Sequence, residues 1–242
     1  LWLFFGKLKE VKPSFKFFDK SAAKQVVGLG GVFFLIQIAL IALNSSNEIY
    51  INAFFNASDV VQYTYYHKMF YVLTVLITLF LQPIWSAVTK AYCERRFKWV
   101  LKMYWIANAF GAILCLGSFL LAAIYQPLAD IWLGKGTLVV QPWIAVLFAI
   151  HTSMYIISNT TNSFSNGFSK LKCQTICTIS GAILKLLFVV FAVTYIENAS
   201  WSVVMLSNIV ALIPLSIVHP IYIYSFIKKS TTKKELTQIK DE

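Results

Sequence analysis

Polar side chains recur at helical spacing inside stretches of the chain that are otherwise apolar. Residues at positions i, i+4, i+7 and i+11 lie on one face of an α-helix. Five apolar stretches carry such a polar face, formed by Gln37, Asn44 and Glu48; by Thr64, Lys68, Tyr71, Thr78, Gln82 and Ser86; by His151, Tyr155, Ser158 and Asn162; by Gln174, Thr178, Gly181 and Lys185; and by Asn208 and His219. Ammonium, amide, hydroxyl and aromatic groups in this arrangement are suited to holding a polar or anionic ligand.

Lys185 is the most informative of these residues because it falls near the middle of its apolar stretch. A cation at the centre of a membrane costs several kcal/mol unless it is hydrated or paired. Lys68 lies nearer to one end, where a long side chain can reach the interface. Each would attract an anion such as phosphate as a point charge. Burial in a structural pair is the alternative for Lys185, and snorkelling is the alternative for Lys68.

Three further residues are candidates for binding a coupling ion. Glu48 could pair with Lys68, bind a cation or face water, and His151 and His219 could titrate near neutral pH. A histidine that is hydrogen-bonded for packing is the ordinary alternative within a membrane. Further residues on these polar faces that could line a hydrated lumen are Gln82, Thr78, Tyr71, Asn162 and Tyr155. Interhelical hydrogen bonding is the alternative for them.

The elements that must position these residues are membrane-spanning helices. The composition is 58% hydrophobic and 13% charged. A hydrocarbon core of ~30 Å needs about 20 apolar residues in a helix, with every backbone hydrogen bond made internally. We predict an all-α integral membrane protein with six spans, at about 27–50, 61–88, 100–124, 138–158, 173–194 and 201–224. A basic amphipathic linker is expected over 1–26 and a basic tail over 225–242.

The charges favour one orientation. The formal net charge is +11, and all of the 21 Lys and Arg residues except Lys68, Lys135 and Lys185 fall on one side of the membrane if the six spans alternate. Positive charge gathers on the cytoplasmic side of membrane proteins, so both termini of this segment are expected there. The same clustering beside apolar spans argues against nucleic acid as a partner and favours membrane lipids.

No constellation of catalytic residues is present, and we expect neither an enzyme nor a cofactor. The sequence has no P-loop, nucleophile elbow or cluster of metal ligands. Cys173 and Cys177 share a helix face but have no histidine or carboxylate beside them. The chain begins at Leu1 with an apolar run, Leu1–Gly6, typical of the exit of an earlier helix. It is therefore expected to be the C-terminal half of a longer transporter whose N-terminal half is missing.

Four segments resemble one family. KSAAKQVVGLGGVFFLIQIALI (20–41) is similar to the start of the seventh helix of bacterial polysaccharide flippases of the Wzx type. NEIYINAFFNASDVVQY (47–63), QPIWSAVTKAY (82–92) and NGFSK (166–170) resemble later segments of that family in the same order. Glu48 stands where the family usually has Asp, and Ala57 stands near an expected Gly.

The resemblance implies two six-helix bundles around a central cavity, of which this chain would be one. It also implies the substrate, an oligosaccharide repeat unit on undecaprenyl diphosphate, moved across the bacterial inner membrane for O-antigen or another surface polysaccharide. Coupling to H⁺ or Na⁺ is possible. Lys185 and Lys68 would face the diphosphate, and Gln82, Asn162, Tyr71 and Tyr155 would face the sugars. The alternatives are a drug or cation antiporter of the same superfamily, which would favour lumen carboxylates, and a membrane assembly subunit without transport.

Overall fold

The computed structural model describes residues 19–197 and 199–241, and these residues form helices joined by short loops, with no strand among them. The helices are α2 (Lys20–Asn44), α3 (Asn47–Phe54), α4 (Ala57–Cys93), α5 (Phe97–Ala123), α6 (Tyr125–Leu133), α7 (Pro142–Gly167), α8 (Leu171–Tyr195), α9 (Ser202–Ile213), the π-helical segment η3 (Pro214–Val218) and α10 (His219–Asp241). The chain divides into Leu1–Leu35 and Ile36–Glu242. α2 begins in the first unit and ends in the second, and the expected linker lies largely in residues 1–18, outside the described part.

Six helical stretches are long and apolar enough to cross a membrane, which confirms the predicted fold class for the described residues. They are Val26–Asn44, Ala57–Cys93, Phe97–Ala123, Pro142–Gly167, Leu171–Tyr195 and Ser202–Thr232. Much of their outer surface is apolar and exposed, as at Leu116 (73%) and Ile113 (64%). Exposed aliphatic side chains on these helices match a lipid environment, which solvates them as well as a protein core would.

Three of the helical stretches differ clearly in extent from the expected spans. The last was expected to end at 224, whereas α10 continues to Asp241. The first expected span, 27–50, is interrupted, because α2 ends at Asn44 and α3 begins at Asn47. The fourth expected span ended at 158, whereas α7 continues to Gly167. The last turns of α7 are rich in Ser, Thr and Asn, so they read as a loop by hydropathy, but most of their side chains are buried. Packing inside the bundle, rather than contact with lipid, stabilises this part of the helix.

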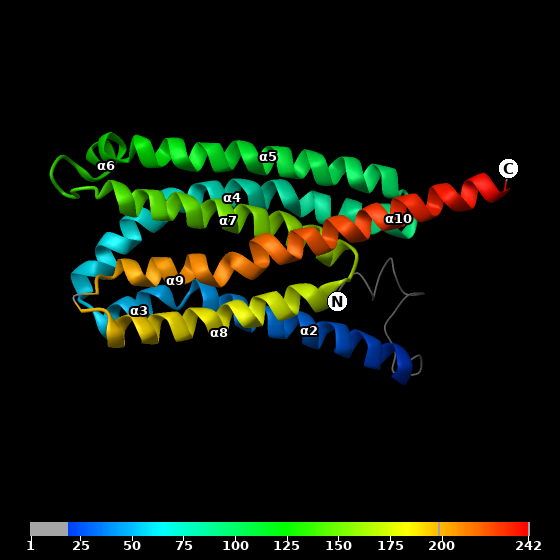
Figure 1. The fold of residues 1–242 in the computed structure, drawn as a ribbon, viewed down its shortest axis with the longest axis horizontal. Coiled ribbons are helices and arrows are strands. Elements are labelled where there is room, and N and C mark those ends of the chain that lie inside the picture. The colour runs from blue at the N-terminus through cyan, green and yellow to red at the C-terminus, as the bar shows by residue number, and fades with distance from the viewer. Residues whose placement is uncertain (1–18, 198, 242) are drawn as a thin grey trace, which may run out of the picture. The chain divides into compact units, whose positions relative to one another are not determined.

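Within the second unit, α7 is the central helix. It packs along α4 and α5 and also contacts α9, η3 and α10 (Figure 1). Close approach depends on glycine at Gly167, where an added Cβ would lie 2.8 Å from Val88 Cγ1. In the most apolar stretch of α7 half of the residues are buried, whereas about a fifth are buried in the corresponding stretches of α4 and α5.

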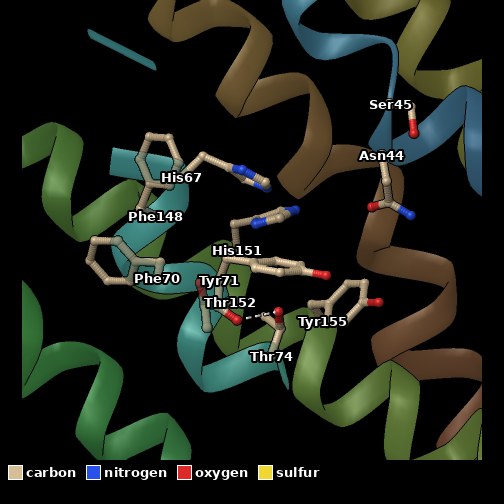
Figure 2. A pocket seen from close by; sticks show the side chains of 10 residues that line it. All are labelled: Asn44, Ser45, His67, Phe70, Tyr71, Thr74, Phe148, His151, Thr152 and Tyr155. Carbon is tan, nitrogen blue, oxygen red and sulfur yellow. Dashed lines mark hydrogen bonds between the residues drawn. The ribbon is translucent and has the colours of Figure 1, made fainter. Parts of the chain in front are cut away.

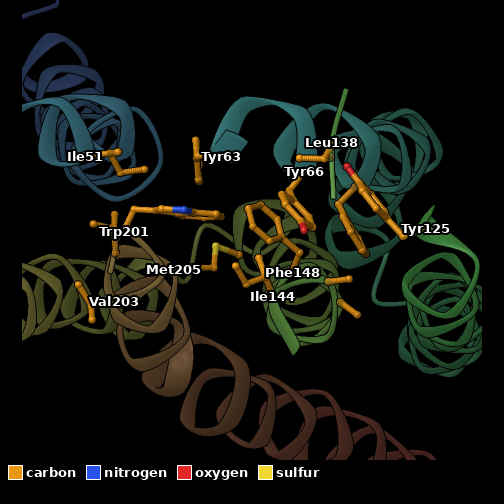
Figure 3. Packing of buried hydrophobic residues seen from close by; sticks show 14 of the residues in the cluster. Ile51, Tyr63, Tyr66, Tyr125, Leu138, Ile144, Phe148, Trp201, Val203 and Met205 are labelled. Carbon is orange, nitrogen blue, oxygen red and sulfur yellow. The ribbon is translucent and has the colours of Figure 1, made fainter. Parts of the chain in front are cut away.

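One end of the unit is closed by an aromatic cluster (Figure 3). Tyr66 stacks on Tyr125 with ring centroids 4.8 Å apart and planes 8° apart, and its ring also stacks on Phe148 at 5.4 Å. The Tyr66 hydroxyl accepts a hydrogen bond from the Gln141 backbone N–H at 2.9 Å. Offset aromatic pairs of this kind add about 0.5–1.5 kcal/mol beyond the burial of their area. The cluster therefore ties α4, α6 and the start of α7 together.

The loops α4–α5 and α7–α8 and the continuation of α10 lie at the other end, which we call the basic end (Figure 1). Both loops use a left-handed residue, Arg95 (φ 55°) and Ser169 (φ 54°). In each, the following backbone N–H bonds to a carbonyl five residues earlier, Arg96 to Ala91 and Lys170 to Ser165. This pattern ends a helix and satisfies its last carbonyls.

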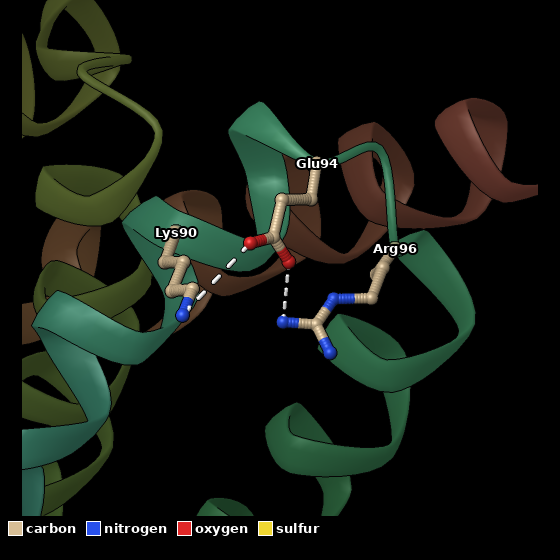
Figure 4. Close-up of polar contacts among 3 residues, drawn as sticks. All are labelled: Lys90, Glu94 and Arg96. Carbon is tan, nitrogen blue, oxygen red and sulfur yellow. Dashed lines mark ion pairs between the residues drawn. The ribbon is translucent and has the colours of Figure 1, made fainter.

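Glu94 lies between two basic side chains at the α4–α5 turn (Figure 4). Its carboxylate is 2.5 Å from Arg96 and 4.0 Å from Lys90. All three side chains are substantially exposed. Exposed pairs of this kind contribute about 0–1 kcal/mol. The pairs therefore order the turn more than they stabilise the fold, and the basic end keeps its excess of positive charge.

Candidate functional site

A cavity of about 360 Å³ lies between α4, α7 and the junction of α2 with α3. Hydrogen-bonding side chains form much of its wall, from Asn44, Ser45, His67, Thr74, His151 and Thr152. Aromatic rings form the rest, from Phe70, Tyr71, Phe148 and Tyr155. Figure 2 shows this mixed lining. A concave site that combines aromatic walls with a few polar groups is the usual form of a small-molecule site.

Two histidines meet in this cavity from different helices. His67 is on α4 and His151 is on α7, and Figure 2 shows their imidazole rings next to each other. Aromatic neighbours one turn away on α4 hold the ring of His67: Tyr63 stacks on it at 5.5 Å, and Tyr71 lies at 5.6 Å. The spacing of these three residues is i, i+4, i+8, so one helical face positions all of them. Neutral imidazoles offer one donor and one acceptor each, and protonated ones would present positive charge to an anion.

The aromatic residues of the cavity are placed to contact a ligand. Tyr71 is 54% exposed although it lies within a membrane span. Tyr155 is half-buried on α7, one turn after His151. Thr74 donates its hydroxyl to the Tyr71 carbonyl at 2.8 Å, which fixes its side chain against its own helix. Each of the two tyrosines thus offers a ring surface and a hydroxyl that makes no hydrogen bond to another described residue.

The polar face of α7 continues from the cavity toward the basic end. His151, Tyr155, Asn159, Asn162 and Asn166 follow one another at intervals of three or four residues, and all are half-buried. The face meets α4 where Asn159 Nδ2 donates to Thr78 Oγ1 at 2.9 Å. This contact brings the predicted residue Thr78 beside the polar face of α7, next to the cavity but not in its wall.

Lys185 does not line the cavity, although it was the leading candidate for a lumen cation. Its side chain is 1% exposed. Its Nζ donates to the Leu43 carbonyl, to Ser46 Oγ at 2.9 Å and to Asn47 Oδ1 at 2.7 Å. The ammonium therefore occupies the break between α2 and α3, where it donates to a carbonyl in the last turn of α2 and to two side chains at the start of α3.

Lys185 is nevertheless linked to the cavity through one amide. Asn47 is 4% exposed, and its Nδ2 donates to the Tyr63 hydroxyl at 2.9 Å. Tyr63 in turn stacks on His67 of the cavity wall. The lysine, the amide, the phenol and the imidazole thus form a continuous series of contacts from α8 through α3 to α4.

The structure places the other predicted residues apart from the cavity. Lys68 and Gln82 are exposed on α4, and Gln82 borders a shallow groove with Trp85, Ser86 and Thr89. Glu48 is exposed on α3 and borders a second shallow depression. His219 is fully buried and lies outside the cavity wall. Of the predicted substrate and ion candidates, the structure brings Tyr71, Tyr155 and His151 together.

Sequence reasoning missed several residues that belong to the site. Asn47, Tyr63 and Thr152 were not singled out, and His67 was not among the coupling-ion candidates. Asn47 follows Asn44-Ser45-Ser46, and such a run favours side-chain bonds to the backbone over an uninterrupted helix. That signal could have located the break, because Asn44 bonds to the Leu40 carbonyl at 3.0 Å and Asn47 to the Asn44 carbonyl at 3.1 Å.

Comparisons with other proteins do not assign the site. Comparison of the chain with models of protein families, with curated proteins and with solved structures finds no match. Within residues 19–197 and 199–241, no three or more His, Cys, Asp and Glu side chains are grouped so that they could hold a metal ion. The arrangement of the cavity is therefore the basis for any functional conclusion.

Proposed function

We propose that this chain is one bundle of a flippase that moves oligosaccharide repeat units, linked to undecaprenyl diphosphate, across the bacterial inner membrane. The observation that carries the proposal is the cavity between α4 and α7. Its aromatic and hydrogen-bonding lining lies inside helices that are otherwise apolar. A membrane helix keeps costly polar groups in its interior chiefly where they serve a pathway or a binding site.

The sugar portion of the substrate fits this lining. Sugar hydroxyls need donors and acceptors, and the apolar faces of sugar rings pack on aromatic rings. Tyr71 and Tyr155 offer both kinds of contact, and Asn44 and Thr152 add hydrogen-bonding groups. The cavity of about 360 Å³ is at the lower end of the size range of ligand sites, so it would hold part of a repeat unit rather than all of it. The second bundle of the transporter would supply the remaining contacts.

The diphosphate would contact groups other than Lys185. Lys185 is engaged with the α2–α3 break, so its role in the proposal is to fix the wall of the site. His67 and His151 lie in the wall itself, and Lys68 is exposed on α4. We assign anion attraction to Lys68, and hydrogen bonding to the phosphate oxygens to the imidazole N–H groups of His67 and His151. Glu48 and His219 remain coupling-ion candidates of the proposal.

The membrane orientation of the proposal follows from the charges. The α4–α5 and α7–α8 loops carry Arg95, Arg96, Lys170 and Lys172 at the basic end. We place this end in the cytoplasm. The cavity then lies on the periplasmic side of the bundle, and the polar face of α7 extends from it toward the cytoplasm. Rocking of two bundles around such a site is the general mode of alternating access.

The test is deletion of the complete gene in its host, with measurement of surface polysaccharide. Complementation uses wild type, Tyr155→Ala and, as a matched control away from the cavity, Tyr195→Ala, whose side chain is 73% exposed. We expect loss of polysaccharide in the deletion, recovery with wild type and Tyr195→Ala, and poor recovery with Tyr155→Ala. Unchanged polysaccharide with reduced drug tolerance would support the antiporter instead. No change in either would support an assembly subunit.

A further inference from the structure

A second group of buried polar atoms lies outside the cavity, where η3 meets α7 and α8. Within the described residues, buried side-chain oxygens of Asn162, Asn166 and Gln174 have no hydrogen-bond partner, and the same is true of both ring nitrogens of His219. His219 is 0% exposed and Gln174 is 3% exposed. The only other such side-chain atom in this part of the chain is the Tyr125 hydroxyl, in the aromatic cluster.

Three of these residues, Gln174, His219 and Asn162, lie at a similar depth in the bundle, and Asn166 lies one turn nearer the basic end. Gly181 of α8 lies directly against the Ala211 backbone, and the two helical segments run in opposite directions (Figure 1). Gln174 is two turns before Gly181 and His219 two turns after Ala211, which puts both ~10–12 Å from that contact toward the basic end.

The depth of Asn162 in the bundle can be compared with that of Gln174 by counting residues from the α7–α8 turn. Lys170 N–H donates to the Ser165 carbonyl at 3.0 Å, and Ser165 Oγ donates to the Lys170 carbonyl at 2.8 Å. From this pair, Asn162 and Gln174 both lie ~4–6 Å deeper in their helices. η3 and α10 both contact α7 and α8, and His219, which is fully buried, is the residue at which η3 passes into α10.

The helix changes form immediately before His219. η3 is π-helical, and the His219 backbone N–H bonds to the Pro214 carbonyl five residues earlier. Isolated π-turns within α-helices are often found at functional sites. Pro214 and Pro220, on either side, have no backbone N–H to donate. A local widening of the helix therefore coincides with the group of unpaired side chains.

We infer that this junction is a binding site for internal water, which hydrogen-bonds to His219 and to the amide oxygens of Gln174 and Asn162. An unpaired buried polar group costs about 1–3 kcal/mol, and His219 would leave both of its nitrogens in that state. Proteins commonly satisfy such groups with buried water that makes about three hydrogen bonds. The amide oxygens accept and water donates, while a neutral imidazole provides one donor and one acceptor. The inference does not depend on the proposed function.

Radiolytic hydroxyl-radical labelling tests the site directly, because ordered internal water forms radicals beside the side chains it contacts. The full chain in lipid nanodiscs would be exposed to X-rays in ¹⁸O water and analysed by mass spectrometry. Met205 is the internal control, since it is 1% exposed, oxidises readily and lies in the aromatic cluster. We expect ¹⁸O labelling of His219 at least several times faster than that of Met205. Equal rates, or an unlabelled His219, would overturn the proposal.

Thermal unfolding supplies an independent measurement, because the change in Tm of the variants should have opposite signs for a hydrated and for a dry junction. Gln174→Leu and His219→Leu would lower Tm by about 2–4 °C if each removes partners from bound water. Tyr125→Phe, which removes the other unpaired atom without changing shape, is the control and should leave Tm unchanged or raise it. A rise in Tm for Gln174→Leu and His219→Leu would show a dry junction and overturn the proposal. Replacing NaCl with choline chloride tests for a bound cation. If this replacement lowers the Tm of the wild type but not that of the two Leu variants, the site binds a cation and the proposal is overturned.

Discussion

Lys185 Nζ lies 2.7 Å from Asn47 Oδ1, and this contact decides which way the Asn47 amide points. An ammonium only donates, so the amide oxygen must face it. The amide nitrogen then faces the Tyr63 hydroxyl, 2.9 Å away, and that hydroxyl accepts. The orientation of Tyr63, which stacks on His67 in the cavity wall, is thus tied to a lysine on another helix.

Replacing Lys185 should first affect stability. Lys185→Met removes the donor from the Leu43 carbonyl and from Asn47 Oδ1, both of which remain buried. We expect a loss of about 1–3 kcal/mol in unfolding free energy, measured by denaturation in mixed detergent micelles. Lys172→Met on the same helix, at an exposed position, is the control and should change little. Full stability with complete loss of transport would contradict the structural role and restore Lys185 as a substrate ligand.

Two glycines offer substitutions with opposite expected effects. In Gly181→Ala the new Cβ would collide with the Ala211 carbonyl oxygen and push α8 away from α9, at a cost of about 1–3 kcal/mol. In Gly117→Ala the Cβ would meet nothing within 4 Å, so the gain in helix propensity should stabilise α5 by up to about 1 kcal/mol. Unfolding free energies of the two variants measured in parallel would check both. Equal effects would contradict the close α8–α9 contact.

The hydroxyl of Tyr155 should matter for transport without affecting the fold. Tyr155→Phe keeps the aromatic ring in the cavity and removes one hydrogen-bonding group, worth about 1 kcal/mol, or about fivefold in affinity. We expect a reduced rate of surface-polysaccharide export at unchanged protein level and unchanged Tm. Tyr195→Phe serves as the matched control. Normal export by Tyr155→Phe would show that Tyr155 contributes only ring contacts. Normal export by Tyr155→Ala as well would show that it does not belong to the site.

The orientation can be tested with single-cysteine variants and a membrane-impermeant maleimide. Cys93 is exposed at the end of α4 that joins the basic loop, whereas Ile131, 82% exposed, lies on α6 at the other end. With the basic end in the cytoplasm, intact cells should label Ile131→Cys but not Cys93. Inverted membrane vesicles should label Cys93 but not Ile131→Cys. The reverse pattern would overturn the positive-inside assignment.

Hydropathy was sufficient to predict the six spans, because lipid exposure makes each span apolar over most of its circumference. It failed at two places for the same physical reason. The end of α7, after Ser158, is a polar segment buried within the bundle, and the α2–α3 break is bonded to Lys185 of α8. The state of both therefore depends on partners distant in sequence. Hydropathy counts composition along the chain and contains no information about such partners.

The candidate site could be predicted in part. His151, Tyr155 and Tyr71 belong to polar faces whose helical spacing is visible in the sequence, and all three line the cavity. Lys185 shares the same kind of spacing on α8 but points to the α2–α3 break. Spacing identifies the face of a helix, whereas the neighbour of that face is set by packing. Gly181, one turn before Lys185 and pressed against Ala211, is what directs that face of α8 inward.

The bond from Lys185 to the Leu43 carbonyl has a consequence for how the chain is made. The two residues are 142 positions apart, so the break after α2 leaves the ribosome long before its ammonium partner exists. Until α8 is inserted, the Leu43 carbonyl and the Asn47 amide must be satisfied by water or by lipid headgroups. We therefore expect the α2–α3 segment to reach its final depth in the membrane only after the fifth span has been inserted.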